Sequence, residues 1–445
     1  MIKRTLLLLF FFGTMALAQA QHAQMVKVGD HSLEMIQAGT GEYTVLFESG
    51  FGTGYKVWGN VASEVMKTNQ VMLYSRAGTG NSEANPNPHT LEQAVQDLET
   101  LMEEAGLKGP FILVGHSYGA FLIRAYAAKH PDNVKGFVFV DPAHEKMLQE
   151  LKKVDPAKAV KDMELQNRSV PARFKQENEA INRIFEKAEL PDFGKLPQVP
   201  TVVLTSVQKR ATPELFLQEP KGVDVWRNLH HAFFSQFTNG AHVVTARSGH
   251  NIHREEPELV VNAIHQVVQA ATKEQQRKVH EAKLAALEAK MLQAATYLKQ
   301  RKEPKAEAVV FDALKSSGLD ERTINTIAYQ QLNDQDHMGL ALLTFKYNTL
   351  QYSQSANAFD SYGEALLKQG KLKLAEQQFQ RAVELASAAN DTATLKNSKT
   401  HLEKINQLKK SQIRKVVGAP GLLKLMVRGR YMKAVVKRGS AFSRR

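Results

Sequence analysis

The sequence predicts an α/β fold over about the first 270 residues and an all-α region after it. In the first part, short apolar runs rich in Val, Leu, Phe and Ile alternate with segments of helical period, which is typical of a largely parallel sheet with helices on both faces. From Lys273 to Leu408 the composition changes to Ala, Leu, Lys, Glu and Gln, without a strand pattern. A chain of 445 residues with 43% hydrophobic content is therefore expected to form two or three folded units.

The strands of the sheet are expected at the apolar runs, and the first run is expected to form a hairpin around Gly29-Asp30. Helices between them are expected at 91–105 and 118–129, and a third at 257–270 closes the series. The predicted strands are the hairpin at 26–37 and the single runs at 43–48, 70–74, 111–115, 136–140, 200–205 and 241–246.

One connection in this series is unusually long. Residues 145–190 are charged, helical in period and free of strand-like runs. A connection between a helix and a strand typically has about 2 to 6 residues. We therefore predict that residues 144–199 form a helical lid, here called the insertion. A set of surface helices that merely covers the sheet is the alternative.

The first twenty residues have the features of a secretory signal peptide. Lys3 and Arg4 precede an apolar run at 6–12, and small residues follow. The run is too short for a membrane anchor, which needs about 20 apolar residues. We expect cleavage near Ala18 or Ala20 and export of a bacterial protein, periplasmic or secreted, whose first domain covers residues 21–272.

The net charge of +13 is concentrated at the C-terminal end. Residues 409–445 contain 12 Lys and Arg and no Asp or Glu, whereas the rest of the chain is nearly neutral. Apolar residues lie among these charges. The basic tail is therefore expected either to be solvated or to bind an anionic membrane surface. Nucleic acid is not an expected partner of an exported protein.

Residues 273–408 contain a repeated pattern. The segment 358–385 has small and large residues at spacings that resemble the tetratricopeptide repeat, and a shift of 34 residues gives a degraded copy that keeps Ala341 and Phe345. The resemblance implies a helical repeat domain that binds a protein partner, and a plain helical bundle is the alternative. Flanking helices are expected at 274–300, 304–316 and 394–408.

The segment Gly115-His116-Ser117-Tyr118-Gly119 matches G-x-S-x-G and lies between a predicted strand and a predicted helix. The glycines permit a sharp turn that holds the serine in a strained conformation with its hydroxyl exposed. The chain contains no cysteine, which excludes a thiol nucleophile, a disulfide framework and a Cys-ligated zinc site. Ser117 is therefore the predicted nucleophile.

A serine nucleophile needs a base, and His250 is the predicted one. Ser248-Gly249-His250 follows the last predicted strand and precedes a helix, which puts an imidazole on a loop downstream of the serine. His253 is the nearest alternative. The two histidines together also suggest a metal, but no third cluster of ligands accompanies them, so neither a metal nor another cofactor is expected.

The third member of a catalytic triad is an acid that orients the histidine. No carboxylate follows the strand at 200–205 until Glu214. Asp141, in contrast, directly follows the strand at 136–140 and is the predicted acid. Glu145 and Glu214 are the alternatives, and a role for Asp141 as a helix cap also stays open.

Backbone amides are expected to stabilise the negative charge of a tetrahedral intermediate. The N–H of Tyr118 belongs to the predicted turn, and the N–H of Phe51 lies in the glycine loop after the strand at 43–48. A dinucleotide-binding loop would need a third glycine where Tyr55 stands. We therefore predict Phe51 and Tyr118 as oxyanion donors and no dinucleotide.

Together these segments resemble the α/β-hydrolase superfamily, specifically bacterial serine hydrolases, over residues 25–271. The chain departs from the common pattern at Ser49, where such enzymes often have histidine, and in the missing acid after the penultimate strand. Asp141-Pro142-Ala143 is similar to the acid segment of pancreatic-type lipases. The segment Ser206-Val207-Gln208-Lys209 matches S-x-x-K, but it leaves a strand instead of opening a helix, so we treat it as coincidence. The segments that carry the resemblance are 48–52, 75–82, 115–119 and 248–250.

The resemblance implies a serine hydrolase that transfers an acyl group to water through Ser117, His250 and Asp141, and the predicted signal peptide indicates that this hydrolase is exported. A small-molecule carboxylic ester is the expected substrate, and amides, thioesters and lactones stay open because fold and triad do not select the acyl group. The alternative is an interaction protein whose repeats bind a partner and whose hydrolase-like part is an inactive scaffold. The intact Ser/His pair favours the enzyme.

Overall fold

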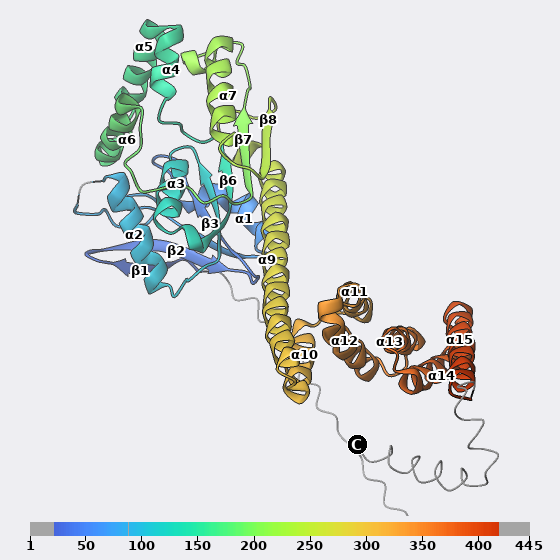
Figure 1. Cartoon of the computed structure of the whole chain (residues 1–445). Helices are drawn as coiled ribbons and strands as arrows, with labels where there is room; N and C mark the ends of the chain where they lie inside the picture. Colours follow the sequence, from blue (N-terminus) through green and yellow to red (C-terminus); the bar gives the residue numbers. More distant parts are fainter. Residues whose placement is uncertain (1–21, 88, 418–445) are drawn as a thin grey trace, which may run out of the picture. The chain divides into compact units, whose positions relative to one another are not determined.

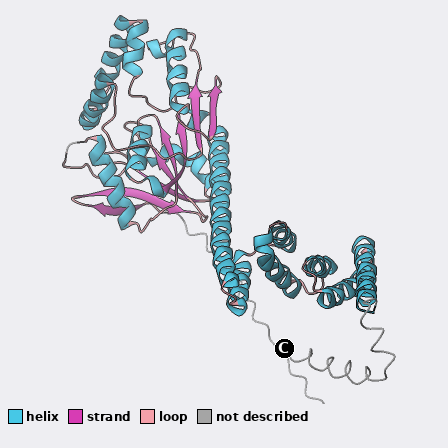
Figure 2. Cartoon of the chain, in the orientation of Figure 1, coloured by secondary structure: helices cyan, strands magenta, loops and turns pink. Residues whose placement is uncertain are grey.

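The computed structural model describes residues 22–87 and 89–417 and separates two compact units, divided in the sequence between Gln276 and Arg277 (Figure 1). The predicted signal peptide and the end of the predicted basic tail, residues 418–445, lie outside the described residues. The strands belong to the first unit, and the described part of the second unit is helical (Figure 2). No helix in the described ranges is long and apolar enough to cross a membrane.

The first unit is built on an eight-stranded sheet in the order β1-β2-β4-β3-β5-β6-β7-β8. The predicted hairpin is confirmed as β1 and β2, β2 pairs antiparallel with β4, and the other neighbours are parallel. Each predicted strand is confirmed to within two residues. The strands are β1 (Gln24–Val28), β2 (His31–Ala38), β3 (Thr44–Glu48), β4 (Gln70–Tyr74), β5 (Phe111–His116), β6 (Val134–Val140), β7 (Thr201–Ser206) and β8 (Gly240–Thr245).

Helices cover both faces of the sheet. Because side chains alternate along a strand, Leu113 of β5 packs with α2 (Leu91–Glu104), α3 (Gly119–Lys129) and α7 (Pro220–Phe234). Ile112 packs with α1 (Gly59–Val65) and the first part of α9 (Pro257–Lys299) on the other face. The predicted α/β fold class is confirmed.

Four helices differ from the sequence prediction. The prediction did not include α1, α7 and α8 (Ile252–Glu255), which are short or lie next to irregular segments. It also placed two helices at 257–270 and 274–300, where the structure has the single helix α9. Ala271, Thr272 and Lys273 between the two predicted helices carry no helix-breaking glycine or proline, so the helix continues through them.

The insertion between β6 and β7 is helical, as predicted. It contains α4 (Met147–Val154), α5 (Pro156–Arg168) and α6 (Lys175–Lys187), with a 3₁₀ turn, η3 (Ala172–Phe174), before the last (Figure 1). Helix α5 begins where Asp155 accepts a hydrogen bond from the Lys158 amide, with Pro156 at its first position. The other short helical segments of the chain are η1 (Tyr55–Trp58), η2 (Pro131–Asn133), η4 (Phe216–Gln218), α8 (Ile252–Glu255) and η5 (Gln335–His337).

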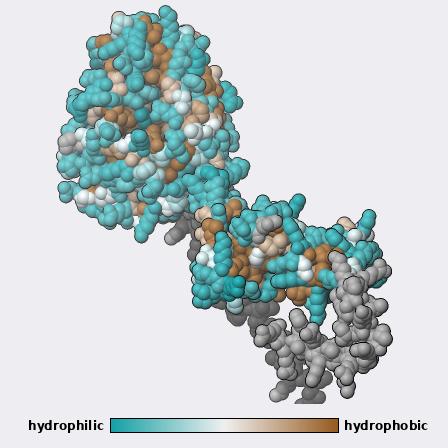
Figure 3. Space-filling view, viewed as in Figure 1, coloured by the Kyte–Doolittle hydropathy of each residue, from teal (hydrophilic) through white to brown (hydrophobic). Residues whose placement is uncertain are grey.

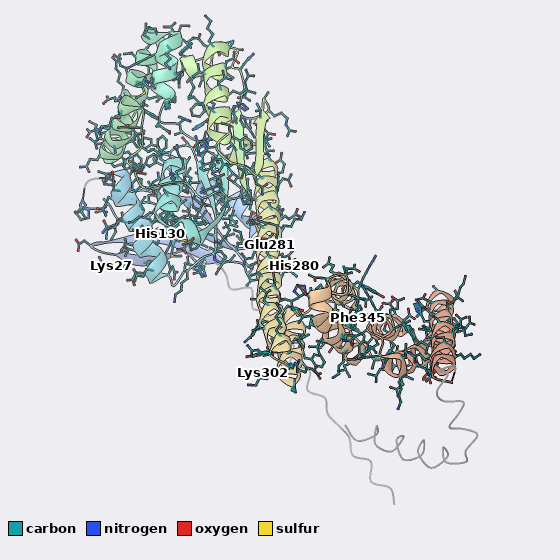
Figure 4. The ribbon with its side chains drawn as sticks, viewed as in Figure 1. Lys27, His130, His280, Glu281, Lys302 and Phe345 are labelled. Atoms are coloured by element: carbon teal, nitrogen blue, oxygen red, sulfur yellow. The ribbon has the colours of Figure 1, made fainter. Side chains whose placement is uncertain are left out.

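The second unit packs its helices around small and aromatic residues. Phe345 of α12, labelled in Figure 4, and Phe379 of α14 are both fully buried. A β-carbon at Gly363 of α13 would lie 2.8 Å from the Phe379 ring, so the glycine lets these two helices approach. The tetratricopeptide character of this unit stays a prediction. Its helices after α9 are α10 (Glu303–Ser317), α11 (Glu321–Leu332), α12 (Met338–Gln351), α13 (Ala356–Lys368), α14 (Leu372–Ala389) and α15 (Thr392–Val417).

Candidate active site

Ser117 lies in the sharp turn between β5 and α3. Its φ of +50° is unusual for a residue with a side chain and indicates local strain. A β-carbon at Gly119 would lie 2.5 Å from the carbonyl oxygen of Glu48, so only glycine permits the close packing that follows the turn. The Ser117 amide donates to the Val140 carbonyl at 3.2 Å, and the Ala143 amide donates to the Ser117 carbonyl at 3.0 Å. These bonds tie the turn to the end of β6.

Asp141 follows β6 and makes the bond that the sequence prediction requires. Its Oδ2 lies 2.7 Å from Nδ1 of His250. Its Oδ1 accepts from the Ser206 amide and from Nε1 of Trp226, both at 2.9 Å. The Asp141 side chain is only 3% exposed, and three donors from three parts of the fold fix its orientation.

His250 lies on the loop after β8, with half of its side chain exposed. Its backbone carbonyl accepts a hydrogen bond of 2.9 Å from Nε2 of His116. Burial lowers the pKa of His116 well below its usual value, so this ring is neutral at pH 7, and Nε2 must carry its proton because a carbonyl can only accept. His116 thus holds the backbone of the histidine loop. Apart from the place of His116 before Ser117, nothing in the sequence indicates this role.

The alternative acids lie elsewhere. The Glu145 carboxylate binds the Arg124 guanidinium at 2.7 and 3.2 Å. Burial opposes the ionisation of Glu145, but Arg124 outweighs it and lowers the pKa of this carboxyl to about 2. Glu214 is exposed and does not line the cavity described below. The Nδ1 of His250 pairs with Asp141 and with neither of these two carboxylates.

His253 is buried, and its ring lies 4.7 Å from that of Trp58 and 4.3 Å from that of His116. Burial lowers its pKa to about 3, which makes it a neutral packing partner. In the described ranges, no group of three or more His, Asp or Glu side chains is arranged to hold a metal ion. The hydroxyl of Ser206, from the S-x-x-K match, donates to the Ser248 carbonyl at 2.7 Å and holds β7 to the histidine loop.

One cavity of about 560 Å³ contains all five predicted site residues in its lining. The insertion supplies apolar wall residues, among them Met147, Ile181 and Phe185. Polar and charged residues also line it, including Asn178, Asn182, Gln208, Arg210 and Arg254. The cavity can therefore hold a small organic molecule of mixed polarity beside the Ser117 hydroxyl.

The two amides predicted as oxyanion donors border the same cavity. Within residues 22–87 and 89–417, neither the Phe51 N–H nor the Tyr118 N–H donates a hydrogen bond to another protein group. The side chain of Tyr118 is buried. Two backbone donors near a serine hydroxyl are an arrangement that can stabilise an oxyanion.

Comparison with known proteins shows the family of this chain. Residues 43–178 match the family model for the alpha/beta hydrolase fold. An uncharacterized protein of Bacillus subtilis (strain 168), YqjL, is 30% identical over 237 residues, which are 52% of this chain and 86% of that protein. The chain therefore belongs to the α/β-hydrolase family, and this membership supports a hydrolase in general.

The chain is also similar to part of one further curated protein and to one solved structure. A (lyso)-N-acylphosphatidylethanolamine lipase of Bos taurus is 34% identical over 97 residues, which are 21% of this chain and 28% of the lipase. The structure of mouse alpha/beta hydrolase domain-containing protein 10 covers 56% of this chain and 98% of that chain, with 17% identity and a TM-score of 0.42. This chain thus spans most of the Bacillus protein but less than a third of the bovine lipase.

Proposed function

We propose that this protein is an exported serine hydrolase that cleaves carboxylic esters by acyl transfer to water. The observation that carries the proposal is the 2.7 Å bond between His250 and Asp141 on a cavity that also contains the strained Ser117. The match with a lipase over 97 residues supports an acyl ester as the substrate. Export rests on the predicted signal peptide at residues 1–20.

In the first half of the reaction, the Ser117 oxygen attacks the ester carbonyl carbon, and Nε2 of His250 accepts the hydroxyl proton. Asp141 holds Nδ1 and stabilises the imidazolium. The carbonyl oxygen becomes an oxyanion that accepts from the Phe51 and Tyr118 amides. When the tetrahedral intermediate collapses, the C–O bond to the alcohol breaks, and His250 returns the proton to the leaving alcohol.

In the second half, water attacks the acyl-serine, and His250 again accepts a proton. The second tetrahedral intermediate releases the carboxylic acid, and the proton returns to the Ser117 oxygen. The apolar wall formed by Met147, Ile181 and Phe185 is suited to an acyl chain.

A fluorophosphonate probe tests the proposal, because it reacts only with an activated serine. We expect labelling of the wild-type protein at Ser117 and no labelling of Ser117→Ala. A series of p-nitrophenyl esters of increasing chain length should be hydrolysed by the wild type only. A folded wild-type protein that neither labels nor hydrolyses any ester would favour the inactive-scaffold alternative.

Two partners outside the active site belong to the same proposal. The second unit exposes apolar side chains such as Leu292 and Leu350, and Figure 3 shows apolar surface, in brown, on its visible face. A protein partner that binds the helical repeats is consistent with this surface. The basic tail at 409–445 is proposed to bind anionic lipid, which vesicle co-sedimentation at low and high salt would test.

A further inference from the structure

Arg76 is a buried arginine beside the cavity that the proposed mechanism does not use. It lies in the segment 75–82 after β4 and is 6% exposed. Its Nη1 donates to Oε1 of Glu48 at 2.5 Å and to the Ser49 carbonyl at 2.6 Å, and its Nη2 donates to the Gly50 carbonyl at 2.8 Å. A buried cation is costly unless it is paired, so these bonds hold the guanidinium in one place.

The bond to Gly50 matters because the Gly50 carbonyl and the Phe51 N–H belong to the same peptide unit. In a planar trans peptide, the C=O and the N–H point in opposite directions. The Gly50 oxygen also accepts from the Thr53 amide at 3.3 Å and from the Thr53 hydroxyl at 3.0 Å. Arg76 and Thr53 together therefore set the direction in which the Phe51 N–H points.

The same guanidinium contacts the second predicted oxyanion residue. The Arg76 Cζ lies 5.0 Å from the centre of the Tyr118 ring, within the range of a cation–π interaction. Arg76 thus touches both segments that supply a predicted donor amide.

The insertion contacts both Arg76 and the glycine loop. Nε of Arg76 donates to Oε1 of Glu177 at 3.1 Å, and Glu177 lies on α6 with its side chain 10% exposed. Phe174, one turn before Glu177, packs edge-on against the Phe51 ring at 5.8 Å between centroids. The insertion therefore contacts the glycine loop both directly and through Arg76.

We propose that Arg76 is a positioning residue for the Phe51 N–H, and that the insertion acts on catalysis through Glu177, which holds the Arg76 guanidinium. This inference rests on the proposed serine hydrolase function. According to this inference, the insertion helps to orient the Phe51 N–H and also forms a wall of the cavity.

Glu177→Ala tests the proposal, with Glu145→Ala as a matched control. Both variants remove a carboxylate at or near the insertion that binds a largely buried arginine, but Glu145 binds Arg124, away from the glycine loop. We expect Glu177→Ala to lower kcat on a short p-nitrophenyl ester about tenfold, a fraction of the roughly 10²- to 10³-fold cost of losing an oxyanion donor, with KM nearly unchanged. Glu145→Ala should lower thermal stability and leave kcat within about twofold of wild type.

Two conservative variants complete the experiment. Glu177→Gln keeps an acceptor for Nε of Arg76 and should recover most of the lost kcat. Arg76→Lys keeps the charge but not the fork that reaches Ser49 and Gly50 together, so kcat should fall about 100-fold. If Glu177→Ala does not fold, the kcat of Arg76→Lys tests the inference by itself.

Three results would overturn the inference: equal kcat values for Glu177→Ala and Glu145→Ala, a loss in Glu177→Ala confined to KM, or a normal kcat in Arg76→Lys. Its failure differs from failure of the proposed function. When only the inference fails, the wild type still labels at Ser117 and hydrolyses esters. When the proposed function fails, the wild type does neither.

Discussion

Each of the two units contains a buried aspartate, and the two aspartates have different kinds of hydrogen-bond partner. In the first unit, Asp141 binds a histidine that is half exposed to a cavity. In the second unit, Asp360 of α13 accepts from the Ser398 hydroxyl at 2.5 Å and from the Asn397 side chain at 2.6 Å, both on α15. Burial raises the pKa of Asp360.

The two carboxylates differ in the chemistry that remains open to their hydrogen-bond partners. The partners of Asp360 are neutral groups whose hydrogen bonds join two helices, so the carboxylate contributes to packing. Asp141, in contrast, leaves the second nitrogen of His250 available to a substrate. Of these two carboxylates, Asp141 is therefore the candidate for catalysis, because its partner His250 is titratable and borders a cavity.

The largest expected effect comes from Asp141→Asn. Loss of the charged acid removes both the correct histidine tautomer and the stabilisation of the imidazolium, so kcat should fall by roughly 10⁴-fold. Asp360→Asn is the matched variant in the second unit and should leave kcat within about twofold while lowering thermal stability. Steady-state ester hydrolysis measures the kcat of both variants, and thermal melts measure their stability. Comparable losses of kcat in the two variants would contradict the distinction between the two carboxylates.

Acid should destabilise the first unit through its buried histidines. Burial lowers the pKa of His144 and of His230 to about 4, and that of His253 to about 3. Because these values lie below that of an unfolded histidine, the unfolded state binds more protons as pH falls below about 6.5, and stability is lost from there toward pH 4. Each group contributes a slope of up to about 1.4 kcal/mol per pH unit.

Tryptophan fluorescence can follow this loss in the first unit alone, because both tryptophans, Trp58 and Trp226, lie there. The midpoint of thermal unfolding should fall between pH 7 and pH 5 and change little between pH 7 and pH 8. His230→Asn should show a smaller fall over the same range. A midpoint that does not change between pH 7 and pH 5 would show that the buried histidines do not control acid stability.

A smaller effect is expected from Trp226→Phe. This change removes one of three donors to Asp141 and keeps an aromatic ring in the core. Hydrogen bonds to charged groups contribute about 1.5 to 3 kcal/mol, and the Ser206 amide still holds the same oxygen, so kcat should fall about tenfold. Normal kcat together with lowered stability would mean that Trp226 only packs. Trp58→Phe is the control, since Trp58 donates to Ser49 and not to Asp141.

The smallest effect should come from removing the second unit. A chain that ends at Gln276 keeps every lining residue of the cavity and the part of α9 that packs on the sheet. Its kcat and KM on a short ester should stay within about twofold of the full chain. A folded but inactive truncated protein would show that the helical unit contributes to the site, and the contrast between the units would then be wrong.

Several parts of the fold could be predicted from the sequence because they depend on neighbours along the chain. The strands follow from apolar runs, and the turn at Ser117 follows from glycines next to it between a strand and a helix. Asp141 could be found because parallel strands bring their carboxyl ends to one edge of the sheet. The continuous α9 and the helix α7 were missed, since the first lacks a boundary signal and the second lies after an irregular segment.

Contacts between residues far apart in the chain could not be predicted from the sequence. Trp226 donates to Asp141 across 85 residues, and Arg76 reaches Glu177 across 101 residues. His116 meets the carbonyl of His250 across 134 residues. These contacts depend on how α7, the insertion and the histidine loop pack on the sheet, and packing is set by the shapes of many side chains together. The strands of the sheet and the turn at Ser117 could be predicted from the sequence, because both are set by local periodicity and local backbone freedom.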